Sequence, residues 1–223
     1  TSVALSVESS DAWVVHDEVY DTLSYTRQHK PARSISALGE RSVLVNSFSK
    51  KFGVPGLRVG WIIAPAHVID VAVKVHEALC LGVSELAERV ALRLIAHPEA
   101  DKWCSKQRSD MSELTDAALG ILGSEAGFRW PIVPMGGMFL FPDVTEVYRR
   151  LPEGACVGAD DAGSAVARYM LERAKVAVVP GAVYGAAGRD HIRISNCGNS
   201  ELLLNAVRRM SAAARLHSVD HFE

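Results

Sequence analysis

The sequence lacks the features that mark several large classes of protein. Its 24 Lys and Arg residues stand against 26 Asp and Glu, a net charge of −2, so there is no basic excess for binding nucleic acid. No apolar run approaches the roughly eighteen residues that a membrane-spanning helix requires. Internal repeats and low-complexity tracts are also absent. We therefore expect an ordinary globular protein that binds neither nucleic acid nor membrane.

Cysteine is scarce and scattered. The four residues, Cys80, Cys104, Cys156 and Cys197, form no Cys-x-x-Cys pair. This spacing argues against a zinc site, and no metal is expected. Isolated thiols are typical of reduced, intracellular proteins, so we expect a cytoplasmic location. No activating base is evident in the sequence near Cys197, so we do not assign it as a nucleophile.

Strand and helix patterns alternate along the 223 residues. They predict an α/β fold, with part of a doubly wound, mostly parallel-sheet large domain in residues 1–97 and a smaller α+β domain in residues 98–223. We place the boundary at His97-Pro98, because the residue before proline is pushed out of helical geometry. Strands are expected at 12–16, 42–46, 59–63, 138–141, 176–179 and 191–195, and helices at 64–79, 83–96, 100–122, 162–173 and 201–216.

Residues 47–61, SFSKKFGVPGLRVGW, hold an unusual set of side chains. Lys50 follows a short β-branched strand, where a lysine is seldom buried without a function. A lysine amine can form a Schiff base with a carbonyl cofactor. The hydroxyls of Ser47 and Ser49 and the guanidinium of Arg58 suit a phosphate carried by that cofactor. Taken alone, these residues fit a surface loop equally well.

A second cluster, Asp17-Glu-Val-Tyr20, follows the first predicted strand. Ligands gather at the carboxyl ends of strands in open parallel sheets, so Asp17 and Lys50 are expected at one site. A carboxylate there can keep the ring nitrogen of pyridoxal phosphate protonated, and Tyr20 can reach the phenolic oxygen of the ring. Asp-x-x-Tyr alone more often reflects turn chemistry. Its pairing with Lys50 favours the cofactor site.

Two motifs together resemble the cofactor site of the class I and II aminotransferases, the fold-type I pyridoxal-phosphate enzymes: Asp17-x-x-Tyr20 and Ser47-x-Ser-Lys50-x₇-Arg58-x-Gly60. The resemblance implies that pyridoxal 5'-phosphate is bound by six side chains: Asp17, Tyr20, Ser47, Ser49, Lys50 and Arg58. Within this set, Lys50 is the implied Schiff-base lysine and proton carrier. Asp17 is implied to hold the pyridine nitrogen, and Tyr20 the ring hydroxyl.

The segment HIRIS at 191–195 resembles the strand on which this family carries its substrate-binding arginine. That arginine is Arg193, implied to bind the substrate carboxylate. Arg193 alternates with Ile192 and Ile194, so it is expected to face the opposite side of the strand. The arrangement is consistent with a guanidinium that faces a site.

The resemblance implies an aminotransferase that moves an amino group between an L-amino acid and a 2-oxo acid, and family members are homodimers. The family places a further segment before these residues, so we expect the chain to be the latter part of such an enzyme. Two alternatives stay open. Fold-type I lyases and synthases use the same residues, and some transcription regulators carry an aminotransferase-like ligand-sensing domain.

Two residue assignments also have rivals. Lys51, next to Lys50, is an alternative Schiff-base lysine, although the step of eight residues to Arg58 favours Lys50. His16 is an alternative partner for the neighbouring Asp17, but a histidine on a buried strand is more often simply packed.

Overall fold

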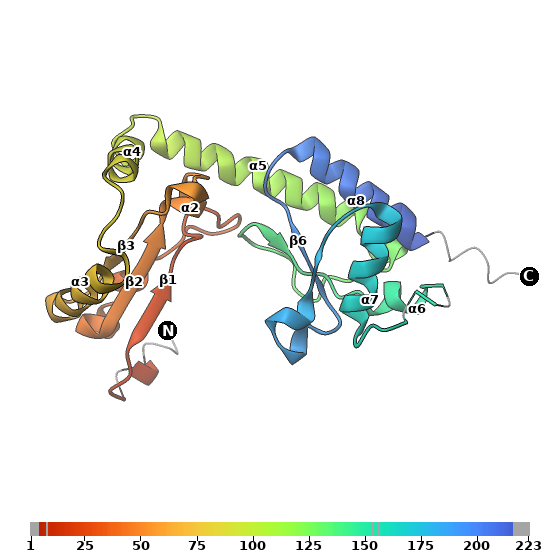
Figure 1. The fold of residues 1–223 in the computed structure, drawn as a ribbon, viewed down its shortest axis with the longest axis horizontal. Helices are drawn as coiled ribbons and strands as arrows, with labels where there is room; N and C mark the ends of the chain where they lie inside the picture. Colours follow the sequence, from red (N-terminus) through yellow and green to blue (C-terminus); the bar gives the residue numbers. More distant parts are fainter. Residues whose placement is uncertain (1–4, 8, 153, 156, 216–223) are drawn as a thin grey trace, which may run out of the picture. The chain divides into compact units, whose positions relative to one another are not determined.

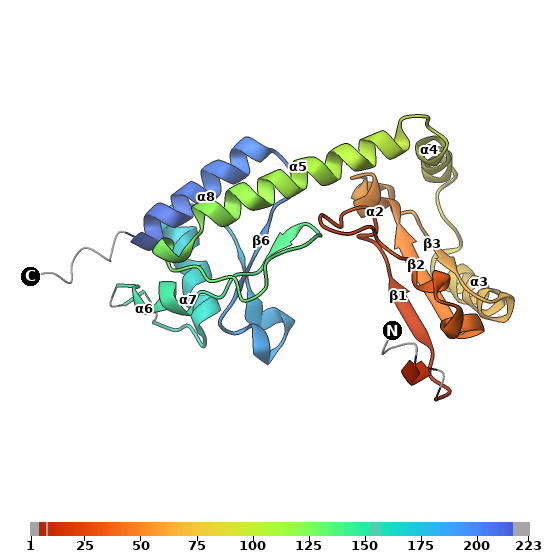
Figure 2. The ribbon, with the colours of Figure 1, turned by 180° about the vertical axis from the view of Figure 1, so that it is seen from behind.

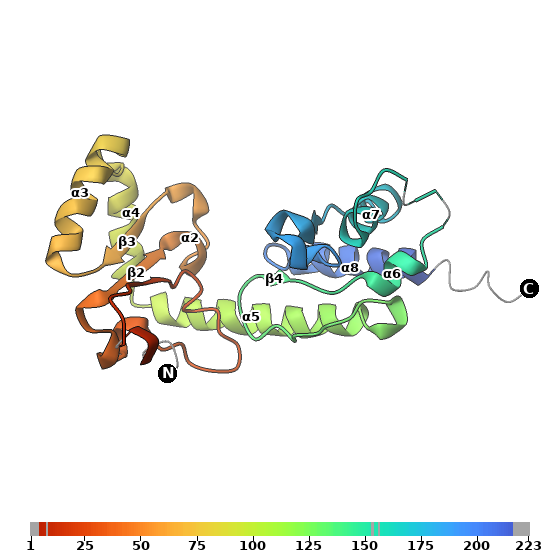
Figure 3. The same cartoon turned by 90° about the horizontal axis from the view of Figure 1, so that it is seen from below.

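A computed structural model describes residues 5–7, 9–152, 154–155 and 157–215. It divides the chain into two compact units, residues 1–108 and 109–223, which we call the N-terminal unit and the C-terminal unit. The division between the units falls inside α5 (Ala100–Ile121), a single long helix (Figure 3). The predicted domain boundary at 97/98 stays a prediction.

The N-terminal unit is built on a three-stranded sheet of β1 (Val14–Asp17), β2 (Ser42–Ser47) and β3 (Gly60–Ile63). Their order is β1-β2-β3, with β1 parallel and β3 antiparallel to β2. In Figure 1 the arrows of β1 and β2 point the same way, and α2 follows the end of β2. β1 extends one residue beyond the expected strand, so Asp17 is its last residue.

Helices of the N-terminal unit follow the sequence expectations closely. α3 (Ala66–Cys80) and α4 (Glu85–Ile95) lie within a residue or two of the predicted ranges. The sequence did not predict α2 (Phe48–Lys51), a single helical turn that contains Lys50. The unit also contains short 3-10 turns: η1 (Ala32–Ser34), η2 (Ser36–Arg41) and η3 (Pro55–Leu57).

The C-terminal unit holds a second sheet, β4 (Phe139–Leu140), β6 (Ile192–Ser195) and β5 (Val179–Pro180), in that order and with antiparallel pairing. The expected strand at 176–179 is therefore wrong in its extent. The N–H of Val176 donates to the carbonyl of Met170 at 3.1 Å, which ties this segment to the preceding helix and away from the sheet.

The C-terminal unit also contains the α-helices α6 (Thr145–Arg149), α7 (Ala162–Tyr169), which continues into a π turn (Met170–Ala174), and α8 (Ser200–Arg215). Short 3-10 helices lie at η4 (Ser124–Ala126), η6 (Gly181–Tyr184) and η7 (Ala186–Gly188). α8 runs beside the C-terminal part of α5 (Figure 2). Leu122 after α5, Val166 on α7 and Val207 and Met210 on α8 are fully buried in one apolar core. Asn196, just after β6, donates to the hydroxyl of Thr115 on α5 at 2.6 Å.

Candidate active site

The strand register of the N-terminal unit brings the predicted site residues to one edge of the sheet. Asp17 pairs with Val45, so β1 and β2 end close together. Gly60 pairs with Ser47, so the antiparallel β3 begins where β2 ends. A Cβ atom on Gly60 would lie 2.7 Å from the carbonyl oxygen of Asn46, which explains why glycine stands there. Asp17, Ser47 and the loop before β3 therefore share the same end of the sheet.

Aromatic packing anchors α2, the turn that carries Lys50. The ring of Phe48, on α2, stacks on Phe52 at a centroid distance of 5.5 Å and meets Trp61 of β3 edge-on at 5.3 Å. Phe52 stacks in turn on Trp103 of α5 at 6.0 Å. One turn of helix is too short to be stable by itself, so these aromatic contacts stabilise α2.

The two adjacent lysines of α2 have different surroundings. The ammonium of Lys51 lies 2.7 Å from Oδ2 of Asp21 and 5.6 Å from the centroid of the Trp61 ring. The half-buried side chain of Lys50 makes no ion pair or hydrogen bond with any residue that the structure describes. Of the two candidate amines, Lys51 has an ion-pair partner and Lys50 has none within the described part of the chain.

Asp17 is exposed at the end of β1, and its Oδ1 accepts a hydrogen bond from the N–H of Val19 at 3.3 Å. The adjacent Glu18 is buried and points elsewhere. Its carboxylate accepts a hydrogen bond from the N–H of Ala32 at 2.6 Å and lies 3.5 Å from His16 and 3.2 Å from His29. His16 thus lies against Glu18, with 42% of its side chain exposed.

Tyr20 and Asp21 follow in the turn after β1. Tyr20 is half-buried. The N–H of Asp21 donates to the carbonyl of Glu18 at 3.0 Å, and the N–H of Leu23 donates to the carbonyl of Tyr20 at 2.9 Å. These bonds define a compact turn, so the side chain of Tyr20 begins from a fixed backbone position.

Arg58 adopts a left-handed backbone conformation, with φ of 55°. This region is uncommon for residues other than glycine and is often found at functional sites. Its guanidinium donates to the carbonyl of Pro55 at 2.7 Å. The next residue, Val59, accepts a hydrogen bond from the N–H of Phe48 at 3.1 Å, which ties this loop to the start of α2.

A cavity of about 530 Å³ opens beside Arg58. Its polar lining includes His76 from α3 and Ser84, which precedes α4. Ser47 stands at the N-cap position of α2, yet its hydroxyl makes no capping hydrogen bond. Ser49 lies on α2, one residue before Lys50. Of the three expected phosphate ligands, Arg58 lines this cavity and the two serines do not. A guanidinium and hydroxyls are the groups that bind phosphate.

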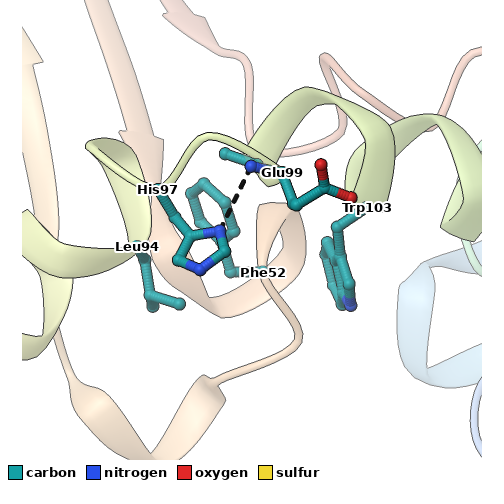
Figure 4. Close-up of a pocket in the computed structure, with 6 residues that line it drawn as sticks. Phe52, Leu94, His97, Glu99 and Trp103 are labelled. Carbon is teal, nitrogen blue, oxygen red and sulfur yellow. Dashed lines mark hydrogen bonds between the residues drawn. The ribbon is translucent and has the colours of Figure 1, made fainter.

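A second cavity, of about 310 Å³, lies where α4, α5 and the residue after α2 meet. Figure 4 shows Phe52 and Trp103 in its wall together with Leu94, His97 and Glu99. The ring nitrogen Nδ1 of His97 accepts a hydrogen bond from the N–H of Glu99 at 3.2 Å, which starts α5. The same aromatic pair therefore lines this cavity and supports α2.

Cys104 lies beneath α2, with its sulfur 3.7 Å from the carbonyl oxygen of Lys51. Burial raises the pKa of this thiol above its ordinary value of 9.0, and the positive charge of Lys51 opposes the rise. The residue is a protonated packing group at neutral pH, because only the thiolate is a strong nucleophile.

In the C-terminal unit, β6 holds Arg193 between two aromatic rings. The guanidinium carbon lies 4.4 Å from the centroid of Phe139 and 5.1 Å from that of Tyr184, both within the range of cation–π interactions. Ile192 and Ile194 are buried on the other side of the strand. The expectation that Arg193 faces away from the two isoleucines is confirmed.

Sequence reasoning overlooked the polar residues that tie these segments together. Asn46 is 3% exposed, and its amide donates to Oδ2 of Asp21 at 3.0 Å. A buried asparagine inside an otherwise apolar strand was the available signal, since buried polar side chains are usually hydrogen-bonded.

The described residues offer neither a membrane-spanning helix nor a metal-binding cluster. Over the described residues, no helix is both long and apolar enough to cross a membrane. In that same part of the chain, no group of three or more His, Cys, Asp or Glu side chains is arranged to hold a metal ion.

Comparison with known proteins identifies related chains. Residues 1–210 match the family described as aminotransferase class I and II. Aspartate aminotransferase of Pyrococcus horikoshii is 25% identical over 213 residues, which cover 95% of this chain and 51% of the relative. Arginine–pyruvate transaminase of Pseudomonas aeruginosa is 30% identical over 92% of this chain and 48% of its own length.

Solved structures of aminotransferases are also similar to this chain. An aromatic aminotransferase from Pyrococcus horikoshii matches with a TM-score of 0.81 and 28% identity, over 95% of this chain and 53% of that one. A double mutant of Thermus thermophilus aspartate aminotransferase matches with a TM-score of 0.80 and 25% identity, over 95% and 51%. The expected fold-type I α/β architecture is confirmed, and the chain spans about half the length of these relatives. The chain belongs to the aminotransferase class I and II family.

Proposed function

We propose that the protein containing this chain is a pyridoxal-phosphate-dependent aminotransferase that moves an amino group between an L-amino acid and a 2-oxo acid. The observation that carries the proposal is the amine of Lys50, which has no ion-pair or hydrogen-bond partner among the described residues and is held on α2 at the same sheet edge as Asp17 and Arg58. The relatives named above are transaminases, which favours this activity over the lyase and regulator alternatives.

The residues at this edge fit the chemistry of pyridoxal phosphate. The cofactor carries an aldehyde, a ring nitrogen, a ring hydroxyl and a phosphate. The amine of Lys50 suits the aldehyde, Asp17 the protonated ring nitrogen and Tyr20 the ring hydroxyl. Ser47, Ser49 and Arg58 suit the phosphate. When bound, the cofactor supplies an electron sink that allows the bond between the substrate Cα and its proton to break.

In this scheme Lys50 has two tasks. With the cofactor bound, the amine of Lys50 would hold it through its aldehyde. The Nζ atom of Lys50 would also be placed to accept the proton from the substrate Cα and to give a proton back, acting as base and then as acid. Both tasks require an amine that is not held in an ion pair, which Lys50 offers and Lys51 does not.

Arg193 is proposed to bind the substrate carboxylate through its two parallel N–H groups. The cation–π contacts with Phe139 and Tyr184 restrict the position of the guanidinium. Fixing the carboxylate aligns the Cα–H bond for proton transfer.

Replacing Lys50 tests the proposal. Transamination is measured in the natural full-length protein, with aspartate, arginine and aromatic amino acids as donors and 2-oxo acids as acceptors. We expect Lys50→Ala to lower kcat by at least about a hundredfold, because it removes the base. Lys102→Ala, on the exposed side of α5, is the control and should leave the rate unchanged. Normal turnover by the Lys50 variant contradicts the proposal.

We further propose that the protein is a homodimer, and that residues 1–97 belong to the cofactor-binding domain while residues 98–223 form the connecting helix and small domain. Light scattering coupled to size exclusion on the full-length protein tests the dimer. A monomeric mass at micromolar concentration would contradict it.

A further inference from the structure

Three polar side chains form a partly buried cluster beside Lys50. The ammonium of Lys51 lies 2.7 Å from Oδ2 of Asp21, and the two side chains are only 21% and 19% exposed. The same oxygen accepts a hydrogen bond from the amide of Asn46 at 3.0 Å. We call Asp21, Asn46 and Lys51 the polar clamp.

The polar clamp joins the three segments that carry the proposed cofactor ligands. Asp21 directly follows Tyr20 in the turn after β1. Asn46 lies one residue before the end of β2, and its side-chain oxygen accepts the N–H of Ser47 at 2.7 Å. Lys51 is the last residue of α2. A single cluster therefore connects the backbone positions of Tyr20, Ser47 and Lys50.

Asp21 is largely buried, so its carboxylate needs a counter-ion. Its other oxygen, Oδ1, is buried and accepts no hydrogen bond from the described residues. Lys51 and Asn46 thus supply the compensation for a largely buried carboxylate, and removing the ammonium leaves that charge without its counter-ion. The ion pair between Lys102 and Glu99 has the same 2.7 Å distance, but its side chains are 78% and 60% exposed. Exposed pairs of that kind contribute little.

We propose that the polar clamp is a positioning device that selects between the two adjacent lysines. It holds the Lys51 amine in an ion pair, and it fixes α2 so that the Lys50 amine is the one presented to an aldehyde. The inference rests on the proposed function, since it concerns which lysine the cofactor meets. Asp21, Asn46 and Lys51 are positioning residues and touch no reacting atom.

The experiment maps the lysine that reacts, in the natural full-length protein. Each variant is titrated with pyridoxal phosphate, reduced with borohydride and analysed by peptide mass mapping. The lysine amine condenses with the aldehyde and releases water. Borohydride then adds hydride to the C=N carbon and solvent adds a proton to nitrogen, which leaves a stable secondary amine. Thermal unfolding of the cofactor-free protein is recorded in parallel.

Four variants are compared with the wild type. Asp21→Asn keeps the size of the side chain and removes its charge. Lys50→Ala is made with Asp21 intact and also combined with Asp21→Asn. Lys102→Met breaks the exposed ion pair and is the matched control.

We expect the wild type and Lys102→Met to carry the adduct on Lys50 alone. Asp21→Asn should bind pyridoxal phosphate about tenfold more weakly and divide the adduct between Lys50 and Lys51, since one lost charge-assisted bond is worth roughly a factor of ten. Lys50→Ala should carry no adduct on Lys51 while Asp21 is intact, and should gain one when Asp21→Asn is added.

Two outcomes overturn the inference: wild-type affinity with all adduct on Lys50 in Asp21→Asn, or an adduct on Lys51 in Lys50→Ala alone. If Asp21→Asn does not fold, Lys51→Met and its conservative partner Lys51→Arg replace it. Loss of affinity in the first with retention in the second supports the clamp, and equal affinity in both contradicts it. Failure of the proposed function is distinct, because the wild type then forms no adduct on Lys50.

Discussion

Adjacent residues of this protein can have very different interaction partners. Lys50 and Lys51 are adjacent, but successive residues of a helix point about 100° apart, since each turn holds 3.6 residues. Lys51 consequently meets Asp21, thirty residues earlier in the chain, whereas Lys50 meets no charged partner among the described residues. Arg58 likewise adopts a left-handed backbone conformation, which its side-chain type does not favour.

Glu146 on α6 provides a pH-dependent prediction at this scale. A hydrogen bond from Arg150 to its carboxylate, at 3.1 Å, holds the pKa of Glu146 below its ordinary value of 4.5; burial opposes this shift, and the charges of Arg150, Arg149 and Arg129 add to it. A carboxyl whose pKa is lower in the folded state stabilises the fold above its unfolded pKa and loses that contribution as pH falls through the folded pKa.

We therefore expect Glu146→Gln to be less stable than the wild type by about 1 kcal/mol at neutral pH. The difference should shrink as the pH falls below the ordinary value of 4.5. Urea unfolding of both proteins across a pH series measures it. A stability difference that persists unchanged in acid would contradict the role given to the Arg150 hydrogen bond.

At the scale of elements, close backbone contact decides how α7 packs in the C-terminal unit. The N–H of Gly163 donates to the carbonyl of Arg189 at 2.7 Å. A Cβ at Gly163 would lie 2.9 Å from that oxygen and would overlap the carbonyl oxygen of His191. Asp161 caps the same helix by accepting the N–H of Ser164 at 2.7 Å. These contacts hold α7 against the segment that leads into β6 and Arg193.

Gly163→Ala is expected to destabilise the protein by about 1–3 kcal/mol, because the added methyl group forces the backbone apart. The loss should appear although alanine favours a helix over glycine by about 1 kcal/mol. Gly120→Ala is the matched control, since a Cβ there meets nothing within 4 Å, and it should be neutral or stabilising. Denaturant unfolding measures both. Equal stability of the two variants would contradict the packing argument.

At the scale of the whole molecule, the two units differ in how much apolar surface they bury. The C-terminal unit has an extensive core around Phe128, Leu140 and Met210. In the N-terminal unit, α3 has no buried residue, and Val71 and Leu79 are 60% and 78% exposed. Large exposed apolar patches usually mark surfaces that other protein segments cover.

This contrast predicts that backbone amides in the two units of the 223-residue chain are protected from hydrogen exchange to different degrees. Local opening takes less free energy where few apolar contacts are buried. Hydrogen exchange monitored by mass spectrometry should therefore show slow exchange in α7 and α8 and faster exchange in α3 and α4. Protection of α3 equal to that of α8 would contradict it.

The long helices, most strands, the family resemblance and the candidate residues could all be predicted from the amino-acid sequence. These features depend on local periodicity, on glycine and proline punctuation, and on motif spacing, all of which can be read along the chain. The meeting of Asp17 and Lys50 at one edge of the sheet was also predicted, from the position of each after a strand. The tertiary structure was needed for the pairing of Lys51 with Asp21 and for the short β5. Each of these depends on contacts between residues far apart in sequence. Local sequence patterns do not show which of several possible long-range partners a residue contacts.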